Sequence, residues 1–418
     1  METKTPIKNG WTQHKIKDFG AVSTGTTPST KNPNYYGGPY KLISPSDLTD
    51  SKYIFTAHKF ITQQGLTVAR TLPKNAVLVG CIGNVGKIGI TTDEISAFNQ
   101  QINAIVCNAN YNADFVYYLL RYQRPLLESK AAKVTLPILN KNNFENIEFE
   151  VPDLPEQKSI ARVLTVVQDA ISGQEELIAK LKELKRGMMQ YLFTHGTKSE
   201  KTKITELGEM PESWEIHNLG DYELDIGDGN YSTKYPKQNE FIEKGVPFIR
   251  ANNFDDGKIT WVDMRFISPE LHKEITKGHL KSGDVLIVTR GDIGKTAIVT
   301  KEFVGANINA QIVRLNGRDV FDQKYLFYLL NYSPILNQVL GLKTGTALQQ
   351  LPIGKLKFVP LIHTAIDEQR TIGEHLSAID ERIFVIQEKL AAYQNLFKTL
   401  LHELMNGERR VQLSNNNL

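Results

Sequence analysis

The chain has 418 residues, of which 41% are hydrophobic and 23% charged, and a net charge of +3, which indicates a globular protein of two to four domains. Its polar N-terminus and the lack of any apolar run of about 20 residues predict a cytoplasmic protein without a membrane contact. The two cysteines, Cys81 and Cys107, form no CxxC pair, which argues against a zinc site or a disulfide framework. We expect no metal ion and no cofactor.

Charge is spread evenly along the chain. Residues 1–153 carry 16 basic and 12 acidic side chains, and residues 197–361 carry 21 of each. Because no segment is strongly basic, any surface for nucleic acid has to come from a local arrangement of cations. Such a chain would need a basic partner to hold DNA tightly.

The chain is a duplication with an offset of about 205 to 212 residues. Five segments recur in the same order, which makes chance a poor explanation. The matching pairs are WTQHKIKDFG (11–20) with WEIHNLGDYE (214–223), LVGCIGNVGKIGI (78–90) with LIVTRGDIGKTAI (286–298), FNQQINAIV (98–106) with INAQIVRL (308–315), FVYYLLRYQRPLL (115–127) with YLFYLLNYSPIL (325–336), and Glu156-Gln157 with Glu368-Gln369.

Each half repeats one plan. A globular part of about 150 residues has short Val, Ile, Phe and Tyr runs broken by Gly, Asn and Pro, which predicts mixed, mainly β structure. About 40 residues with helical periodicity follow it. The expected order is a first domain at residues 1–153, a helix at 154–196, a second domain at 197–361, a helix at 362–407 and a polar tail at 408–418.

The two helical segments carry apolar residues at steps that mostly alternate between four and three, which is a heptad seam. Gln174 and Lys185 interrupt the first seam, whereas their approximate counterparts Ile386 and Phe397 are apolar. The seam residues are Ile160, Leu164, Val167, Ile171, Ile178, Leu181, Met188 and Leu192 in the first segment, and Ile372, Leu376, Ile379, Ile383, Ile386, Leu390, Tyr393, Leu400 and Leu404 in the second.

One heptad seam alone is equally well explained by packing on a core, but two equivalent seams favour pairing with each other. The pseudo-twofold symmetry of a duplicated chain favours antiparallel pairing, with one globular domain at each end of a spacer about 60 Å long. The expected fold class is α+β, with two mixed, mainly β domains separated by two long helices in an antiparallel coiled coil.

Longer motifs extend the repeat over nearly the whole chain. They are GTTPSTKNPNYYGGPYKLISPSDL (25–48), GDGNYSTKYP (227–236) with GVPFIRANNFDDGKI (245–259), SGDVLIVTRGDIGKTAIV (282–299), VPDLPEQKSIARVL (151–164) and DEQRTIGEHL (367–376). This ordered set resembles the target recognition domains and spacer junctions of type I restriction-modification specificity subunits. The second junction, VPLIHTAIDEQ, is longer than VPDLPEQ and lacks its second proline, and the two openings differ from each other.

The resemblance implies a non-catalytic subunit of an adenine-specific DNA methyltransferase and endonuclease complex. Each recognition domain of such a subunit reads one half of a split target in double-stranded DNA, and the helices fix the gap. The implied partners are two modification subunits and usually two restriction subunits. The different openings suggest two different half-sites.

Polar, basic and aromatic side chains in the loops are the candidates for DNA contact, because base edges require donors and acceptors and phosphates require cations. In the first half they are Thr27, Ser29, Lys31, Tyr35, Tyr36, Asn84, Lys87, Lys130 and Lys133. In the second half they are Asn230, Lys234, Lys237, Arg250, Asn252, Asn253, Arg290, Asp292, Lys295, Lys343 and Gln349.

Several of these patterns have a purely structural alternative. The G-x-x-G-K segments at 83–87 and 291–295 lack the full P-loop pattern and are better explained as tight turns between strands. Tyr35 and Tyr36 suit a core as well as a surface. The N-x-Q pairs at 99–101 and 309–311 would equally satisfy buried backbone groups.

Two other functions compete with this interpretation. A methyltransferase needs an (N/D)PP(Y/F) motif, and Asn32-Pro33-Asn34-Tyr35 lacks the second proline; a nuclease would need Asp284, Asp292 and Lys295 to act together. We expect neither activity and no catalytic residue. The other possibility is an adaptor whose coiled coil binds proteins and whose globular domains bind no DNA.

Overall fold

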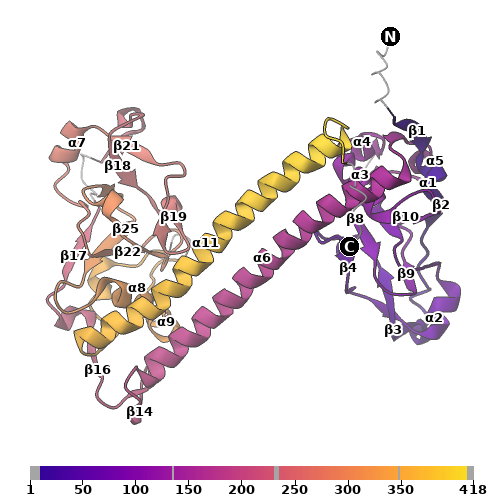
Figure 1. Ribbon diagram of the computed structural model, residues 1–418. Helices are drawn as coiled ribbons and strands as arrows, with labels where there is room; N and C mark the ends of the chain where they lie inside the picture. Colours follow the sequence, from indigo (N-terminus) through magenta and orange to yellow (C-terminus); the bar gives the residue numbers. More distant parts are fainter. Residues whose placement is uncertain (1–9, 134–135, 230–234, 347–348, 412–418) are drawn as a thin grey trace. The chain divides into compact units, whose positions relative to one another are not determined.

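The computed structural model describes residues 10–133, 136–229, 235–346 and 349–411. The chain forms two compact units, residues 1–175 with 388–418, and residues 176–387. Each unit contains one globular domain together with one part of α6 (Leu154–His195) and one part of α11 (Ile366–Met405) (Figure 1).

The first domain is built on two mixed sheets. One has the strand order β2-β10-β7-β8-β4 and the other β5-β3-β9-β6, and β1 pairs with β13 where the chain enters and leaves the domain. The strands are β1 (Thr12–Lys15), β2 (Gly20–Thr24), β3 (Tyr36–Ile43), β4 (Tyr53–Ile54), β5 (Phe60–Ile61), β6 (Thr71–Leu72), β7 (Val77–Gly80), β8 (Ile88–Thr91), β9 (Ser96–Phe98), β10 (Ile102–Cys107), β11 (Ala132–Lys133), β12 (Pro137–Ile138) and β13 (Glu148–Val151). The helices before α6 are α1 (Ile16–Phe19), α2 (Gln63–Val68), α3 (Ala113–Tyr122), α4 (Arg124–Ser129) and α5 (Lys141–Glu145).

The alternation of side chains along β7 gives the five-stranded sheet two buried faces. Val77 and Val79 belong to the core that contains α3, whereas Leu78 belongs to a separate core with Phe98 and Ile43 of the second sheet. Neighbouring residues of a strand point to opposite faces, so the sheet is covered by a helix on one side and by the other sheet on the opposite side.

The second domain repeats this arrangement. The order β17-β25-β22-β23 corresponds to β2-β10-β7-β8, the parallel pair β18–β24 corresponds to β3–β9, and β16–β26 corresponds to β1–β13. The strands are β14 (Thr202–Thr205), β15 (Gly208–Pro211), β16 (Glu215–Asn218), β17 (Asp225–Asp228), β18 (Val246–Ile249), β19 (Phe254–Asp255), β20 (Lys258–Ile259), β21 (Arg265–Ile267), β22 (Asp284–Val288), β23 (Thr296–Ile298), β24 (Asn307–Ile308), β25 (Ile312–Asn316) and β26 (Pro360–His363). The helices before α11 are α7 (Pro269–Glu274), α8 (Gln323–Asn331), α9 (Ser333–Gly341) and α10 (Ile353–Leu356).

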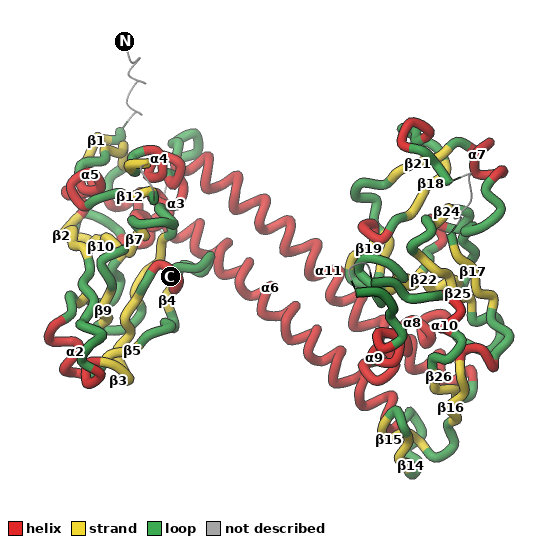
Figure 2. Tube along the Cα trace, turned by 180° about the vertical axis from the view of Figure 1, so that it is seen from behind, coloured by secondary structure: helices red, strands yellow, loops and turns green. Residues whose placement is uncertain are grey.

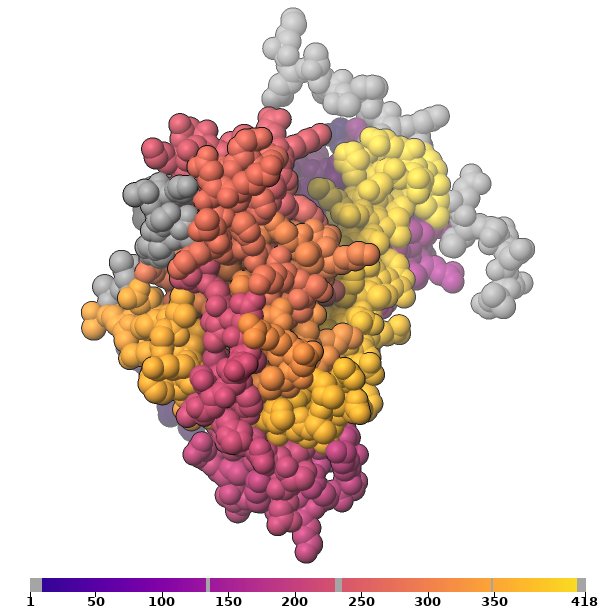
Figure 3. Space-filling view, turned by 90° about the vertical axis from the view of Figure 1, so that its left-hand side faces the viewer, coloured from indigo at the N-terminus to yellow at the C-terminus, as the bar shows by residue number. Residues whose placement is uncertain are grey.

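Short strands and long loops dominate both domains (Figure 2). The hairpin β14–β15 projects from the rest of the second unit, at the bottom of Figure 3, and Ile204 at its tip is 91% exposed. The predicted fold class and the internal repeat are confirmed.

Within each unit, α6 and α11 run antiparallel. In the first unit Leu164, early in α6, shares a core with Phe397 and Leu404, late in α11. In the second unit Leu192, late in α6, shares a core with Ile372, early in α11. Every seam residue is buried or half-buried.

One of the two polar residues that interrupt the first seam, Lys185, has a structural role. Lys185 Nζ lies 2.7 Å from Asp380 Oδ2 on α11, so this break in the apolar stripe is an ion pair between the helices. α6 ends directly before Gly196 and α11 two residues before Gly407. These glycines have φ of +66° and +67°, in the left-handed region that glycine adopts without strain.

The repeated Glu-Gln pair explains how each domain is attached to its helix. The Gln157 Oε1 accepts the N–H of Asn112 at 3.0 Å, and the Gln369 Oε1 accepts the N–H of Asp322 at 2.9 Å. These glutamines therefore tie the start of α3 and of α8 to the long helices. Both long helices begin two residues before the glutamate, so the departure in the second junction does not alter the start of α11.

Candidate nucleic-acid interface

Four loops of the first domain meet along one edge, which we call the first loop edge. The Thr27 hydroxyl donates to Gln100 Oε1 at 2.5 Å. The N–H of Cys81 donates to the carbonyl oxygen of the amide turn at 2.8 Å, and the N–H of Gly83 donates to Pro137 O at 3.0 Å. The four are the opening loop (25–35), the central turn (81–87), the amide turn (99–101) and the late loop (136–140).

The second domain has the same edge, which we call the second loop edge. The N–H of Thr289 donates to Gln311 O at 2.7 Å, and the N–H of Leu351 donates to Thr289 O at 2.8 Å. Arg290 donates to Gln350 Oε1 at 2.6 Å. The central turn (289–295), the amide turn (309–311) and the described part of the late loop (343–351) are thereby joined.

The two G-x-x-G segments are tight turns between strands, as predicted. Gly83 and Gly86 have φ of +75° and +81°, and Gly291 and Gly294 have φ of +85° and +90°. Residues with a Cβ rarely adopt these angles. The glycines reverse the chain, and of the side chains between them Asn84 and Asp292 are exposed, whereas Val85 is buried and Ile293 half-buried.

The amide turns are held by their own side chains. The Asn99 Oδ1 accepts the N–H of Gln101 at 3.0 Å, and the Asn309 Oδ1 accepts the N–H of Gln311 at 3.2 Å. The structural explanation therefore accounts for both N-x-Q pairs. Gln100, which lies between Asn99 and Gln101, is exposed beside the opening loop.

The candidate residues that the structure describes differ in exposure. The exposed ones are Thr27, Ser29, Lys31, Asn84, Lys130, Lys237, Asn252, Asp292, Lys295 and Gln349. The half-buried ones are Tyr35, Tyr36, Lys87, Arg250, Arg290 and Lys343. Asn230 and Lys234 lie outside the described residues, and Lys133 lies in β11 with no described side chain.

The structure brings only some candidates together. The loop edges collect the residues of the opening, central and late loops. Lys130 follows α4, and Lys237, Arg250 and Asn252 lie around β18, outside the loops that meet at the second edge. Tyr36 donates its hydroxyl to Pro28 O at 2.6 Å and so holds the opening loop in shape.

Asn253 requires a correction, because it is completely buried. Its Oδ1 accepts the N–H of Arg250 at 2.9 Å, and its Nδ2 donates to Val262 O at 2.7 Å. Both ends of the amide are used inside the protein. We therefore assign Asn253 to the structure of the turn, and its exposed neighbour Asn252 remains a candidate for contact.

This assignment predicts different effects for two adjacent residues. Asn253→Ala leaves two part-buried backbone groups without their side-chain partner and is expected to lower the free energy of unfolding by about 2 kcal/mol. Asn252→Ala is expected to change it by less than about 0.5 kcal/mol. Urea unfolding followed by circular dichroism measures both. Equal losses would contradict the assignment.

The positions of the three residues that a nuclease would require argue against that alternative. Asp284 begins β22, whereas Asp292 and Lys295 lie in the turn beyond the other end of that strand. A strand of this length spans roughly 13 Å. Asp284 lies 3.5 Å from Arg314 and accepts a hydrogen bond from Asn316 at 2.8 Å, while Asp292 pairs with Lys295 at 2.5 Å. The carboxylates therefore serve two separate sites.

Sequence reasoning missed three residues at or near the edges. Gln100 accepts a hydrogen bond from Thr27, and Gln350 accepts one from Arg290. The exposed Arg70 donates from its guanidinium group to Thr24 O and from its backbone N–H to Thr26 Oγ1 at 2.7 Å. Gln100 could have been found as the middle residue of the repeated N-x-Q pattern. No sequence signal connects Arg70 to the opening loop.

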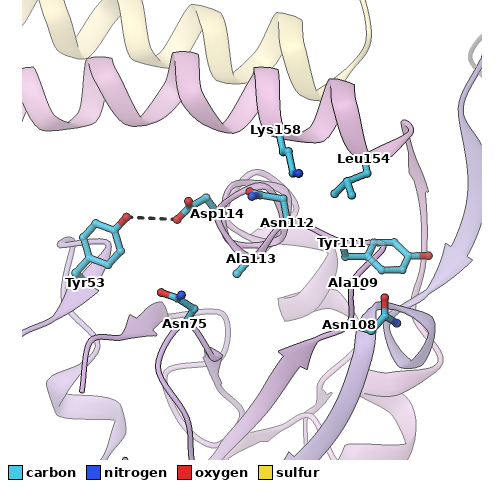
Figure 4. Close-up of a pocket in the computed structure, with 10 residues that line it drawn as sticks. All are labelled: Tyr53, Asn75, Asn108, Ala109, Tyr111, Asn112, Ala113, Asp114, Leu154 and Lys158. Carbon is cyan, nitrogen blue, oxygen red and sulfur yellow. Dashed lines mark hydrogen bonds between the residues drawn. The ribbon is translucent and has the colours of Figure 1, made fainter. Parts of the chain in front are cut away.

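The first domain has a polar cavity of about 270 Å³ where α3 begins beside α6 (Figure 4). Tyr53, Asp114 and Lys158 are among its lining residues. None of its lining residues belongs to the first loop edge. Burial raises the pKa of the Cys81 thiol to about 12, and it does the same for Cys107, so neither is a thiolate nucleophile at neutral pH.

Two further observations concern metal ions and membranes. Within the described ranges, no group of three or more His, Cys, Asp or Glu side chains could hold a metal ion. No helix in the described part of the chain has both the length and the apolar character that a membrane span requires.

Comparison with known families decides the classification. The family of the type I restriction modification DNA specificity domain matches residues 8–183 and, a second time, residues 211–392. The chain belongs to this family. Each of the two specificity-domain matches contains one loop edge and reaches into the long helix that follows it.

Individual relatives agree with the family match. The MjaVIII type I restriction enzyme specificity subunit of Methanocaldococcus jannaschii is 29% identical, over 97% of this chain and 94% of that protein. The crystal structure of a type I specificity subunit from M. genitalium has the same fold, with a TM-score of 0.64 and 14% identity over 99% of both chains. A chain from a structural study of complex assembly and conformational transition in a type I system aligns with a TM-score of 0.52 and 18% identity, over 97% of this chain and all of that one.

Proposed function

We propose that this chain is the DNA-specificity subunit of a type I restriction-modification complex and that each loop edge reads one half of a two-part target. The observation that carries the proposal is the double match to the specificity domain, since each copy contains one loop edge. We assign the recognition domains to residues 1–153 and 197–361, followed by spacer helices at 154–196 and 362–407 and a polar tail.

The two central turns suggest how the half-sites differ. Lys87 in the first turn corresponds to Lys295 in the second, whereas Asn84 corresponds to Asp292 and Ile82 corresponds to Arg290. A lysine at the same place in both turns suits the phosphate backbone, which is the same in every sequence. Asn84 and Asp292 differ in their donor and acceptor patterns, and Ile82 offers an apolar contact where Arg290 offers donors, so the residues that differ suit base reading.

The chemistry would come from partner subunits. The buried cysteines and the separated carboxylates offer no catalytic group. We therefore propose that two modification subunits, which methylate adenine, dock on the helices and that restriction subunits join them. An exposed leucine recurs at equivalent positions of the two helices, Leu184 at 50% and Leu396 at 44% exposure, as expected when one partner binds twice.

The test is a genome-wide map of methylated adenines with and without this chain. The expected result is a two-part motif with a fixed gap that disappears when the chain is removed. The purified chain alone should neither methylate nor cut DNA, and its modification partner should restore methylation. Methyl transfer by the chain alone, or a map that does not change, would reject the proposal; an unchanged map together with partner binding would favour the adaptor.

The recognition domains are expected to be exchangeable. Replacing residues 12–150 by the first domain of another family member should change one half of the methylated motif and leave the other half and the gap unchanged. Replacing residues 215–360 should change only the other half. Methylome sequencing measures both exchanges, and the unmodified chain is the control. A swap that alters both halves would contradict one domain per half-site.

A further inference from the structure

A second repeated feature joins each recognition domain to the long helices. The sequence Asp50-Ser51-Lys52 lies before β4, and the similar Asp256-Gly257-Lys258 follows β19 and includes the first residue of β20. Their backbones occupy equivalent places to within one residue, because Lys52 O accepts the N–H of Ile90 at 2.9 Å and Gly257 O accepts the N–H of the corresponding Ile298 at 3.1 Å. We call these two D-x-K segments the first and second joint loops.

The first joint loop acts through Lys52, whose side chain is 3% exposed. Its Nζ donates to Thr165 Oγ1 on α6 at 2.8 Å and lies 2.7 Å from Asp114 Oδ1 at the start of α3. The rings of Tyr53 and Tyr118 lie 4.8 and 5.0 Å from the same ammonium group. One buried cation therefore connects the domain, α3 and the spacer helix.

The hydroxyls around this cation form a small network. Tyr118 shares a hydrogen bond of 3.2 Å with Thr165, and Tyr53 donates to Asp114 at 3.4 Å. Figure 4 shows Tyr53 and Asp114 turned toward each other below α6. A buried ammonium group is held only where its partners fix its position, so the first joint is stiff.

The second joint loop acts through Asp256 and Lys258. The Asp256 Oδ2 lies 3.1 Å from Lys182 Nζ on α6 and accepts a hydrogen bond from Gln387 Nε2 on α11 at 3.2 Å. Lys258 Nζ lies 3.5 Å from the centre of the Phe384 ring on α11. This loop therefore contacts both long helices.

The two joints differ in exposure. Lys182 is 49% and Asp256 57% exposed, in contrast to the 3% of Lys52. Exposed ion pairs are weakened by salt and by the entropy of holding two long side chains, whereas buried ones are screened much less. We therefore expect the second recognition domain to be held on the helices less rigidly than the first.

We propose that Lys52 and Asp256 are positioning residues that fix each recognition domain on the spacer helices and thereby determine how strictly the gap between the half-sites is held. This inference rests on the proposed function, because a gap has meaning only for a two-part target. Neither residue lies at a loop edge, so neither reads the half-sites. Loosening a joint would widen the range of gaps accepted and leave the bases read unchanged.

The experiment uses the full chain assembled with its modification subunits on a library of targets in which only the gap varies. The readout is methylation at gaps one base pair shorter or longer, divided by methylation at the best gap. This ratio is insensitive to a loss of folded protein, which scales all gaps together. Lys52→Met keeps the aliphatic stem and removes the charge, and the ratio is expected to rise roughly tenfold, the effect of losing a hydrogen bond to a charged group.

Two further variants keep the test decisive. Thr165→Val removes only the helix-side hydroxyl and is expected to raise the ratio in the same direction, even where Lys52→Met does not assemble. Asp256→Asn is expected to raise it about twofold at low salt, with a smaller effect at high salt. The matched controls are the exposed Lys59→Met in the first domain and the adjacent Asp255→Asn in the second, which should leave the ratio unchanged.

The outcomes separate this inference from the proposed function. If the unmodified complex methylates no two-part target with a preferred gap, the proposed function fails. If it does, and Thr165→Val and Asp256→Asn assemble and methylate with the original ratio, the positioning role is wrong. A changed half-site in either variant would also overturn it.

Discussion

Glu368→Ala is expected to lower the free energy of unfolding of the second unit by about 3 to 5 kcal/mol, because several donors, among them the buried Trp214 and Thr364, would lose their shared acceptor. The carboxylate is 1% exposed. Its Oε1 accepts from the N–H and hydroxyl of Thr197, both at 3.0 Å, and its Oε2 accepts from Trp214 Nε1 at 3.2 Å. Lys198 Nζ and the Thr364 hydroxyl complete the set at 3.1 and 2.8 Å.

The same carboxylate predicts a dependence of stability on pH. Burial alone would raise the pKa of Glu368, but the hydrogen bonds from Thr197, Thr364 and Lys198 outweigh it and lower the pKa from 4.5 to about 2. A lowered folded-state pKa stabilises the fold fully above the ordinary value and loses this effect as the pH falls from 4.5 toward 2. The change corresponds to about 3 kcal/mol. Unfolding curves at several pH values should show this loss in the unmodified chain and much less of it in Glu368→Ala.

The repeat supplies a matched control. Glu156 occupies the equivalent place at the start of α6, where Arg410 donates to it from Nε at 2.5 Å and from a terminal nitrogen at 2.6 Å. Arg410 is 46% exposed, so water can solvate it when the carboxylate is removed, whereas the Trp214 and Thr364 donors to Glu368 are buried. Glu156→Ala is expected to cost only about 1 to 2 kcal/mol. Equal losses for the two alanine variants would mean that burial of the partners does not decide the effect.

The features of the fold that depend on periodicity could be read from the sequence. The heptad steps located both long helices, because a buried stripe needs apolar residues at that spacing whatever lies opposite. The order of the recurring segments indicated that the chain is a duplication. The pairing of the strands could not be predicted, since a strand as short as Tyr53–Ile54 shows no alternation of polar and apolar residues that could be detected. Its pairing with β8 is decided by contacts distant in sequence.

The candidate site was predictable as a set of loops, but less so residue by residue. Turn glycines mark where side chains project, so Asn84, Lys87, Asp292 and Lys295 could be assigned to the outside of two turns. Asn253 could not be separated from Asn252 by residue type, since an amide serves a buried turn and a base edge equally well. Lys52 was overlooked because a lysine is normally expected at the surface.

Inserting residues into α6 is expected to change the gap between the half-sites more than any substitution. Four residues added after the half-buried Gln174 contribute about one helical turn, 5.4 Å, and keep the seam within roughly 40° of register. Since DNA rises about 3.4 Å per base pair, the preferred gap should lengthen by about one or two base pairs, with both half-sites unchanged. Two added residues rotate the seam by about 200°, which would turn Ile178 and Leu181 away from α11 and abolish assembly. Methylation of the gap library measures both. If the four-residue insertion yields an active complex with the original gap, α6 does not determine the spacing, and the positions of the half-sites must be set by the modification subunits.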